Sequence, residues 1–360
     1  MKKKIGILTS GGDCAGLNAV IRAVTLRAIK KYDWEVIGIK QGTMGLIYRP
    51  VHANDLTIDD VDTNVLRRGG TILGTTNKGN PFAFPNGDGT FIDQSPQIIE
   101  GIKELGLDAL IGVGGDGSME ILNRIMKKGG INFIGIPKTI DNDIGVTERS
   151  IGFSTAVGVA TEALDRLQPT AASHDRAIIL EVMGRDAGHI ALHAGIAGGA
   201  DIILMPEIPY KLKDIADKIK ELFETGRNFA LVVVAEAVKK ENGESATITD
   251  SNGRKRYGGI SNYLSEKIEE MTGAETRFTV LGHVQRGCQP DAADRVLAAA
   301  LGVRAVDLIA EEKFNRVVVW QNRTVKDVSI DEVIASYQGV DPNDTLVKTA
   351  KGLGIYVGDE

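Results

Sequence analysis

The chain has 360 residues, more than one compact core usually holds, so the sequence predicts two domains. Hydrophobic residues make up 42% and charged residues 25%, as in ordinary globular proteins, and the net charge of −6 argues against nucleic acid as a partner. The two cysteines, Cys14 and Cys288, have no metal-like spacing, and no apolar run reaches transmembrane length, so we expect a cytoplasmic protein without membrane contact.

Short apolar runs alternate with amphipathic segments along the chain. Runs that are apolar throughout predict strands buried on both faces of parallel sheets, with covering helices between them. The predicted strands are Ile5–Thr9, Glu35–Ile39, Ala109–Val113, Asn132–Ile136, Ala177–Val182, Asp201–Met205 and Phe229–Ala235. The predicted helices include Leu17–Tyr32, Gln97–Leu105 and Met119–Met126. The pattern therefore predicts an α/β fold in two lobes, with mainly parallel sheets sandwiched by helices.

Two polar regions interrupt this alternation. Residues Lys78–Ser95 are rich in Gly, Pro, Asn and Asp, which is typical of a surface loop. Residues Lys239–Gly259 are charged and contain glycine, which indicates an exposed hairpin or a flexible insertion. The sequence assigns no role to this second region.

Three polar turns follow predicted strands, namely SGGDCAG at 10–16, GGDGS at 114–118 and KTIDND at 138–143. In parallel α/β sheets, ligands bind at the carboxyl ends of the strands. We therefore expect the three turns to lie on one edge of a sheet and to form the functional site.

The first two turns are glycine-rich and precede helix N-termini. Their glycines are Gly11, Gly12, Gly16, Gly114, Gly115 and Gly117. Uncovered backbone N–H groups and the helix dipole favour a phosphate there, although a tight turn that needs positive φ would have the same composition. Asp13 and Asp116 suit either helix capping or Mg²⁺, which takes one or two carboxylates together with phosphate oxygens. Two such turns on one edge favour phosphate with magnesium.

Residues 112–117, GVGGDG, also match the dinucleotide fingerprint G-x-G-x-x-G after a strand. That fingerprint requires an acidic residue at the end of the next strand, about 20 residues on. The next strand here ends in Pro137-Lys138, and the sequence has no G-x-x-x-x-G-K-[ST] loop. A dinucleotide is therefore the weaker interpretation.

The third turn gathers Lys138, Thr139, Asp141, Asn142 and Asp143 where a buried strand reaches the surface. Phosphoryl transfer to a hydroxyl needs a carboxylate that takes the acceptor's proton and cations that neutralise the moving group. Asp141 or Asp143 supplies the carboxylate. An Asx-rich turn that only closes a strand is the alternative, and the two glycine turns on the same edge favour the catalytic interpretation.

Arginines that suit a phosphorylated ligand recur later in the chain. Arg176 and Arg277 stand at strand starts, Arg185 at a strand end, and Arg286 in GHVQRG at 282–287. Arg binds phosphate through two parallel N–H groups. In a chain of negative net charge, their recurrence indicates an acidic ligand such as a phosphorylated sugar.

His189 and His193 have the i, i+4 spacing of metal ligands on a predicted helix. No Glu of an H-E-x-x-H motif and no obvious third ligand accompany them. We therefore expect packing or polar contacts there in place of a metal.

These segments together resemble the bacterial type of the 6-phosphofructokinase family, almost from end to end. The motifs that carry the resemblance are LTSGGDCAGLNAVIR (8–22), RGGTILGT (68–75), GGDGS (114–118), PKTIDND (137–143), EVMGR (181–185), GIAGGAD (195–201) and TRFTVLGHVQRG (276–287). GGDG turns also occur in NAD and lipid kinases, so the combination of motifs gives the specificity. The resemblance implies an enzyme of glycolysis that uses ATP and Mg²⁺ to phosphorylate the 1-hydroxyl of fructose 6-phosphate.

The resemblance also implies the site residues. Asp141 is the general base and Asp116 is the magnesium carboxylate, with Asp143 supporting it. The catalytic group is completed by Lys138, Thr139 and Arg185. The residues at the nucleotide phosphates are Gly12, Asn77, Lys78, Gly115, Gly117 and Ser118. The residues at the sugar phosphate are Thr139, Asp141, Met183, Gly184, Arg185, Glu236, His283 and Arg286, with Arg176 and Arg277 reaching it from a neighbouring subunit.

The family fold consists of two Rossmann-like α/β lobes. By the resemblance, the larger nucleotide lobe comprises residues 1–152 and about 288–336, and the smaller sugar-phosphate lobe comprises residues 153–287 and about 337–360. The implied assembly is a homotetramer, with a dimer as the alternative.

Residues at the donor end depart from the family in conflicting directions. Asn77 stands where ATP enzymes often have Arg, and Lys138 stands where they usually have Gly, as in pyrophosphate-using relatives. Those relatives carry a second Asp where this chain has Gly117, and the missing side chain leaves room for a nucleotide. We expect ATP as the donor and Lys138 as the cation that replaces the missing Arg. Pyrophosphate and ADP are the alternative donors, and Ile121, where bacterial relatives have Gly, keeps ADP open.

A non-catalytic sugar-phosphate sensor on the same fold is the alternative of another class. Asp116 and Asp141 argue against it, because a sensor has no need of a catalytic base.

Overall fold

The computed structural model describes residues 2–77, 79–249 and 255–358. The chain divides into two compact units. Unit 1 comprises Met1–Ile140, Ile144–Thr155 and Arg286–Tyr337, and unit 2 comprises Asp141–Asp143, Ala156–Gln285 and Gln338–Glu360. The short segment Asp141–Asp143 therefore belongs with unit 2, although unit 1 contains the residues on both sides of it.

Unit 1 is built on a mainly parallel sheet. Its strands are β1 (Lys4–Thr9), β2 (Glu35–Ile39), β3 (Ala53–Asp55), β6 (Ala109–Gly114), β7 (Phe133–Thr139), β8 (Ile151–Gly152), β15 (Arg316–Gln321) and β16 (Thr324–Ser329). The order across the sheet is β16-β15-β7-β6-β1-β2-β3, and β8 pairs with the end of β7. The edge strands β3 and β16 are antiparallel to their neighbours, and the inner strands are parallel.

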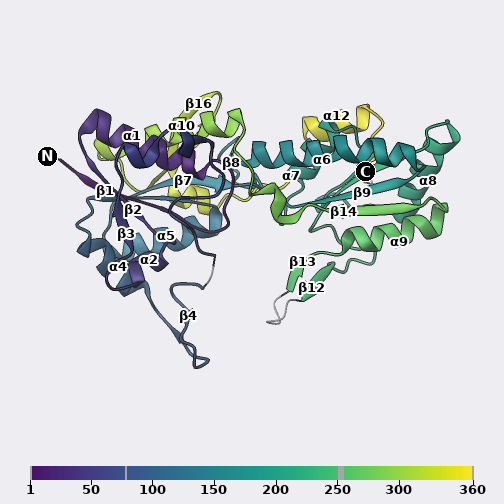
Figure 1. Cartoon of the computed structure of the whole chain (residues 1–360). Coiled ribbons are helices and arrows are strands. Elements are labelled where there is room, and N and C mark those ends of the chain that lie inside the picture. Colours follow the sequence, from purple (N-terminus) through teal and green to yellow (C-terminus); the bar gives the residue numbers. More distant parts are fainter. Residues whose placement is uncertain (1, 78, 250–254, 359–360) are drawn as a thin grey trace. The chain divides into compact units, whose positions relative to one another are not determined.

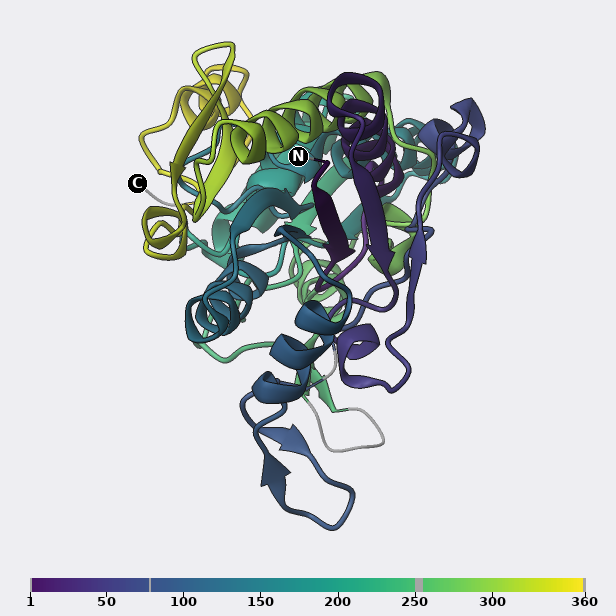
Figure 2. The ribbon, with the colours of Figure 1, turned by 90° about the vertical axis from the view of Figure 1, so that its left-hand side faces the viewer.

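Helices cover both faces of this sheet. They are α1 (Leu17–Tyr32), α2 (Met44–Ile47), η1 (Asp59–Val61), α3 (Thr63–Arg67), α4 (Ser95–Glu104), α5 (Asp116–Gly129), α10 (Ala292–Ala310) and α11 (Ile330–Ile334). Helices α1 and α10 pack together on one face, and α4 and α5 pack together on the other (Figure 1, Figure 2). The core beneath α4 and α5 includes Leu8, Leu110 and Phe133 of the inner strands and Met119 of α5, all fully buried.

Unit 2 has a smaller sheet whose strands are all parallel. They are β9 (Ala177–Val182), β10 (Ile202–Leu204), β11 (Ala230–Ala235) and β14 (Thr276–Val280), in the order β10-β11-β9-β14. The remaining elements are α6 (Phe153–Ser173), which the chain uses to pass from unit 1 to unit 2, α7 (His189–Ala197), α8 (Leu212–Glu224), α9 (Ile260–Thr272), η2 (Gly282–Gln285) and α12 (Thr345–Gly352). Strands β9 and β11 are buried along their whole length, as their mainly apolar sequences predict, and the one charged residue in β9, Glu181, is buried too.

The predicted α/β class, with mainly parallel sheets sandwiched by helices, is confirmed. The limits of most predicted elements differ slightly from those observed, and two of the differences affect the candidate site. Strand β7 continues through Lys138 and Thr139, because these residues pair with Ile151 and Gly152 of β8, so the third polar turn begins later than the sequence indicates. Helix α5 begins at Asp116, because Gly115 serves as its N-cap, so the second glycine turn is the start of the helix.

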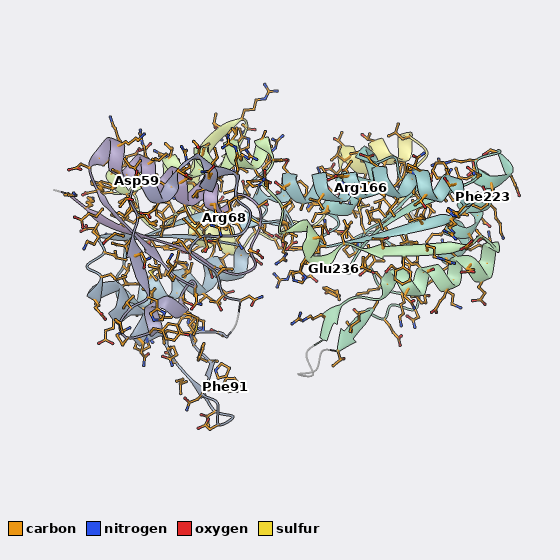
Figure 3. All side chains as sticks on the ribbon, in the orientation of Figure 1. Asp59, Arg68, Phe91, Arg166, Phe223 and Glu236 are labelled. Carbon is orange, nitrogen blue, oxygen red and sulfur yellow. The ribbon has the colours of Figure 1, made fainter. Side chains whose placement is uncertain are left out.

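The two polar regions each contain a hairpin. Strands β4 (Phe84–Pro85) and β5 (Phe91–Ile92) form the first within the predicted loop, and Phe91 at its far end is 68% exposed (Figure 3). Strands β12 (Thr247–Thr249) and β13 (Lys255–Tyr257) form the second, and residues 250–254 between them lie outside the described part. Within the described residues, no helix is long and apolar enough to cross a membrane.

Candidate functional site

The three polar turns follow β1, β6 and β7, which are parallel neighbours in the sheet of unit 1. The ends of these three strands therefore lie on one edge of the sheet, as predicted, whereas Asp141–Asp143 of the third turn belong to unit 2. Contacts between them are direct: a Cβ built on Gly11 would lie 3.1 Å from Oγ of Ser118 and 3.6 Å from Nζ of Lys138. Gly11 has a φ of 81°, so both its conformation and its surroundings require glycine.

The second turn opens the N-terminus of α5 to solvent. Gly115 caps the helix with no side-chain hydrogen bond, which leaves the first N–H groups of α5 without an intrahelical acceptor. A Cβ on Gly117 would have nothing within 4 Å, and a Cβ on Gly114 would lie 2.5 Å from Cβ of Ser118. The turn therefore combines exposed donors, a positive helix dipole and open space, which suits a phosphate.

Lys138 crosses from the end of β7 to the first glycine turn. Its side chain is 4% exposed, and Nζ donates a hydrogen bond to the carbonyl oxygen of Gly12. A buried ammonium needs such partners, and an anion at the turn would be a further one. The structure thus places Lys138 where it can meet a bound phosphate.

Arg286 also lies at the first glycine turn. A side chain on Gly12 would overlap Nη1 of Arg286, so the guanidinium rests against the bare backbone of that residue. Nε of Arg286 is buried and has no hydrogen-bond partner in the described part of the chain. The sequence grouped Arg286 with the sugar phosphate, but within unit 1 it joins Lys138 beside the turn assigned to the nucleotide.

Cys14 in the same turn is a packing residue. Its thiol is fully buried and donates to the carbonyl oxygen of Ile151 at 3.3 Å. Burial raises the pKa of Cys14 to about 12, although Lys138 and Arg286 act in the opposite direction. The thiol therefore stays protonated at neutral pH and is no nucleophile.

Asp116 is the carboxylate to which the sequence analysis assigned Mg²⁺. It is the first residue of α5 and half-buried. No group of three or more His, Cys, Asp or Glu residues that could hold a metal occurs among the described residues. A single carboxylate beside a phosphate site fits Mg²⁺, which usually takes its remaining ligands from substrate phosphates and water.

The remaining predicted site residues of unit 1 are Asn77, Lys78 and Thr139. Asn77 is exposed and follows Thr76, whose carbonyl oxygen accepts a hydrogen bond from the N–H of Gly11 at 3.0 Å. Lys78 lies outside the described residues. Thr139 ends β7, and its carbonyl oxygen accepts from Oγ of Ser150 at 2.7 Å.

In unit 2, Asp141 and Asp143 lie in a tight turn. They are 8% and 5% exposed, and Asn142 between them has a φ of 53°, which Asn tolerates better than most residues. The carbonyl oxygen of Asp143 accepts a hydrogen bond from the N–H of Gln338 at 2.8 Å. The backbone of the turn is thus fixed at Asp143, and both aspartates are buried.

Glu236 and the segment Met183–Arg185 are further candidate site residues of unit 2, besides Asp141 and Asp143. Oε1 of Glu236 accepts from the N–H of Arg185 at 3.0 Å, and the N–H of Met183 donates to Oε1 of Gln285 at 2.8 Å. Burial, the largest cause, and the charges of Asp141 and Glu181 raise the pKa of Glu236, against the lowering effect of the N–H of Arg185. Asp141 therefore shares its surroundings with the residues that the sequence assigned to the sugar.

Gly184 supports this arrangement by its conformation. Its φ is 148°, and a Cβ there would lie 2.5 Å from the carbonyl oxygen of Ala187. The chain consequently turns sharply after β9, and Arg185 follows with a φ of 52°. The guanidinium of Arg185 is exposed at the end of the strand, whereas its backbone is fixed.

Glu207, which the sequence analysis did not single out, and His189 both make hydrogen bonds near the candidate residues of unit 2. Oε1 of Glu207 accepts from the N–H groups of Gly188 at 2.9 Å and Val340 at 2.7 Å, and Nε2 of His189 lies 3.1 Å from the carbonyl oxygen of Gln338. They join the loop after β9 to the segment that holds Asp143. The only available signal was a carboxylate directly after a strand, at Pro206-Glu207. The i, i+4 histidines contact the backbone, as expected, since Nδ1 of His193 lies 2.8 Å from the carbonyl oxygen of His189.

Arg176 and Arg277 lie elsewhere in unit 2. Both pair with Glu275, at 2.7 Å and 2.5 Å, at the starts of β9 and β14. Arg185 follows the opposite end of β9, so about six strand residues, or ~20 Å, separate it from Arg176. A single chain does not bring these two arginines to Glu236. His283 is exposed in η2.

Comparisons with known proteins agree on one family. The sequence model of a family described as Phosphofructokinase matches residues 4–309. The chain is 60% identical over 358 residues to the "ATP-dependent 6-phosphofructokinase 1" of a Synechocystis species, with 99% of each chain covered. It is 48% identical to the "ATP-dependent 6-phosphofructokinase" of Thermosynechococcus vestitus, over 100% of this chain and 94% of the relative.

Solved structures give the same result. Pichia pastoris phosphofructokinase matches with a TM-score of 0.81 and 32% identity, and the chain covers 36% of that longer protein. The phosphofructokinase of Saccharomyces cerevisiae matches with a TM-score of 0.78 and 29% identity, and the chain covers 45% of it. A pyrophosphate-dependent phosphofructokinase of Marinobacter aquaeolei, at 21% identity and a TM-score of 0.80, shares the fold.

Proposed function

The chain belongs to the phosphofructokinase family, and we propose that it transfers the terminal phosphoryl group of ATP to the 1-hydroxyl of fructose 6-phosphate. The observation that carries this proposal is the 60% identity to an ATP-dependent 6-phosphofructokinase over 99% of the chain. The product is fructose 1,6-bisphosphate, and the reaction belongs to glycolysis. The protein acts in the cytoplasm as a homotetramer, in which Arg176 and Arg277 serve the sugar site of a neighbouring subunit.

The donor binds at the glycine turns of unit 1. Backbone N–H groups at Gly12, Gly115 and the start of α5 bind the phosphates, and Ser118 adds a hydroxyl. The open space beside Gly117 supports a nucleotide, because a side chain there would fill it. Lys138 and Arg286 neutralise phosphate oxygens next to the first turn. They take the place of the Arg that ATP enzymes of the family often have at the position of Asn77.

Mg²⁺ is the implied cofactor, and Asp116 would hold it together with the phosphates. The ion supplies charge neutralisation on the donor. Chelation with EDTA should abolish turnover and added Mg²⁺ should restore it, while Asp116→Asn should raise the Mg²⁺ concentration needed for half-maximal activity.

The acceptor binds in unit 2. Asp141 takes the proton of the attacking hydroxyl, and its burial keeps competing water away from the carboxylate. Glu236 and the backbone of Met183–Arg185 orient the sugar, and the guanidinium of Arg185 stabilises charge at the reacting end. Asp143 stabilises the turn that positions the carboxylate of Asp141.

Pyrophosphate as donor is the second candidate function. The specific observation in its favour is Lys138, whose ammonium lies at the first glycine turn and would pair with a short, highly charged donor. A donor panel of ATP, ADP and pyrophosphate with fructose 6-phosphate separates the candidates. Turnover with ATP alone supports the first, and turnover with pyrophosphate alone supports the second.

A further inference from the structure

The hairpin β12–β13 belongs to the inserted region 239–259, to which the sequence assigned no role. It lies between β11 and α9, in the same unit as Glu236 (Figure 1, Figure 3). Thr247 pairs with Tyr257, and the N–H of Gly258 donates to the carbonyl oxygen of Ala246 at 3.2 Å. Ala246 is 5% exposed, so the base of the hairpin is anchored in the unit.

Tyr257, at this anchored base, contacts the loop that follows β9. Its hydroxyl donates a hydrogen bond to Oδ1 of Asp186 at 2.6 Å. The other oxygen, Oδ2 of Asp186, lies 3.6 Å from Nε of Arg185. The side chains therefore form a chain of polar contacts from the hairpin to the arginine at the reacting end.

The electrostatics of Tyr257 agree with this geometry. The hydrogen bond to Asp186, the largest cause, and burial raise the pKa of Tyr257. The positive charge of Arg185 lowers this pKa, and the negative charge of Glu236 adds to the rise. The hydroxyl is therefore close enough to Arg185 and Glu236 to feel both charges, and it keeps its proton at neutral pH.

The guanidinium of Arg185 needs such support because its side chain is 61% exposed. A long exposed side chain loses rotamer entropy when it is fixed for catalysis. Its backbone is already fixed by Glu236, and the carboxylate of Asp186 contacts its side chain. Tyr257 holds that carboxylate from a different element of the unit.

We propose that Tyr257 is a positioning residue of the phosphoryl-transfer reaction, which orients Arg185 through Asp186 and makes the inserted hairpin part of the acceptor side. This inference rests on the proposed function. It identifies Tyr257 and Asp186 as residues that adjust turnover without touching the donor.

The test compares Tyr257→Phe, which removes only the hydroxyl, with Tyr263→Phe. Tyr263 is a matched control on α9, where its ring faces Nζ of Lys240 at 5.7 Å from the ring centroid. We expect Tyr257→Phe to lower kcat with ATP about fivefold, as loss of one partly exposed hydrogen bond would, with the KM for ATP and the melting temperature unchanged. Tyr263→Phe should leave kcat as in the wild type.

A double-mutant cycle identifies the route. In an Asp186→Ala background, Tyr257→Phe should have no further effect on kcat, because the contact that it removes is already gone. Wild-type kcat in Tyr257→Phe, or an undiminished fivefold loss in the Asp186→Ala background, would overturn the positioning role while leaving the proposed function intact. A wild-type chain that phosphorylates no fructose 6-phosphate would overturn the proposed function, and the positioning role with it.

Discussion

The backbone N–H of Gln338 donates a hydrogen bond to the carbonyl oxygen of Asp143 at 2.8 Å. The two residues are far apart in sequence, and both belong to unit 2. The chain just after Gln338 is held in turn by Glu207, which also binds the loop that carries Arg185. The carboxylate of Glu207 thus connects the chain segment that holds the proposed catalytic turn to the proposed sugar loop.

Replacing Glu207 should therefore weaken both stability and turnover. Glu207→Ala removes two hydrogen bonds to a charged acceptor, which we expect to lower the free energy of unfolding by about 2 kcal/mol and kcat by about tenfold. Glu207→Gln keeps a carbonyl oxygen as acceptor and should lose less of each. Urea unfolding and steady-state kinetics of the two variants measure this, and equal losses in both would contradict the role of the acceptor oxygen.

Asp141 should be indispensable for chemistry and dispensable for folding. Asp141→Ser removes the general base, so kcat should fall by about 100- to 10,000-fold. Calorimetric binding of fructose 6-phosphate without donor should persist. Asp165→Ser, which changes an exposed carboxylate of α6, is the control and should leave kcat unaltered. Near-normal turnover of Asp141→Ser would remove the residue from its proposed role.

Lys138 should act on the donor. Lys138→Gln keeps most of the length of the side chain and removes its charge at the first glycine turn, so the KM for ATP should rise and kcat should fall, each by about tenfold. The KM for fructose 6-phosphate should change little. Kinetics with ATP and with pyrophosphate test this, and a variant with unchanged kcat and donor preference would show that the ammonium only supports the turn.

Glu236 should make stability depend on pH. Its pKa is raised in the folded state, chiefly by burial, so folding favours its protonated form. Its contribution to stability is fully present below the ordinary value of 4.5 and is lost as the pH rises through the raised pKa. Glu236→Gln stays neutral throughout, so its stability relative to the wild type should increase from pH 4 to pH 8. Urea unfolding across this range tests the sign, and a relative stability that falls with rising pH would contradict it.

Much of the donor side was predictable because its signals are local. Ile5–Thr9 and Ala109–Val113 are continuous apolar runs, each followed by glycines, and parallel strands bring such ends to one edge. Lys138 and Thr139 were assigned to the turn because the two-residue strand that extends β7, Ile151–Gly152, is too short to have a pattern of its own.

Contacts between distant segments were not predictable. Gln338, Glu207 and Tyr257 are polar residues of ordinary appearance, and only the folded chain brings them to Asp143 and Asp186. The strands β15 and β16 were missed, although RVVVWQ of β15 is rich in β-branched residues and follows a helix; only β16 departs from the strand–helix alternation. Arg176 and Arg277 are residue types that suit a phosphate, as the sequence analysis noted. Within one chain, however, both pair with Glu275 and lie too far from Glu236 to contact the same ligand.

The most direct measurement is a coupled assay of the purified chain with fructose 6-phosphate and Mg²⁺, supplied separately with ATP, ADP or pyrophosphate. We expect ATP to give one equivalent each of ADP and fructose 1,6-bisphosphate, with the other two donors at least tenfold slower in kcat/KM, or about 1.4 kcal/mol in transition-state free energy. Preference for pyrophosphate, or binding of the sugar phosphate with no product from any donor, would contradict the proposed activity.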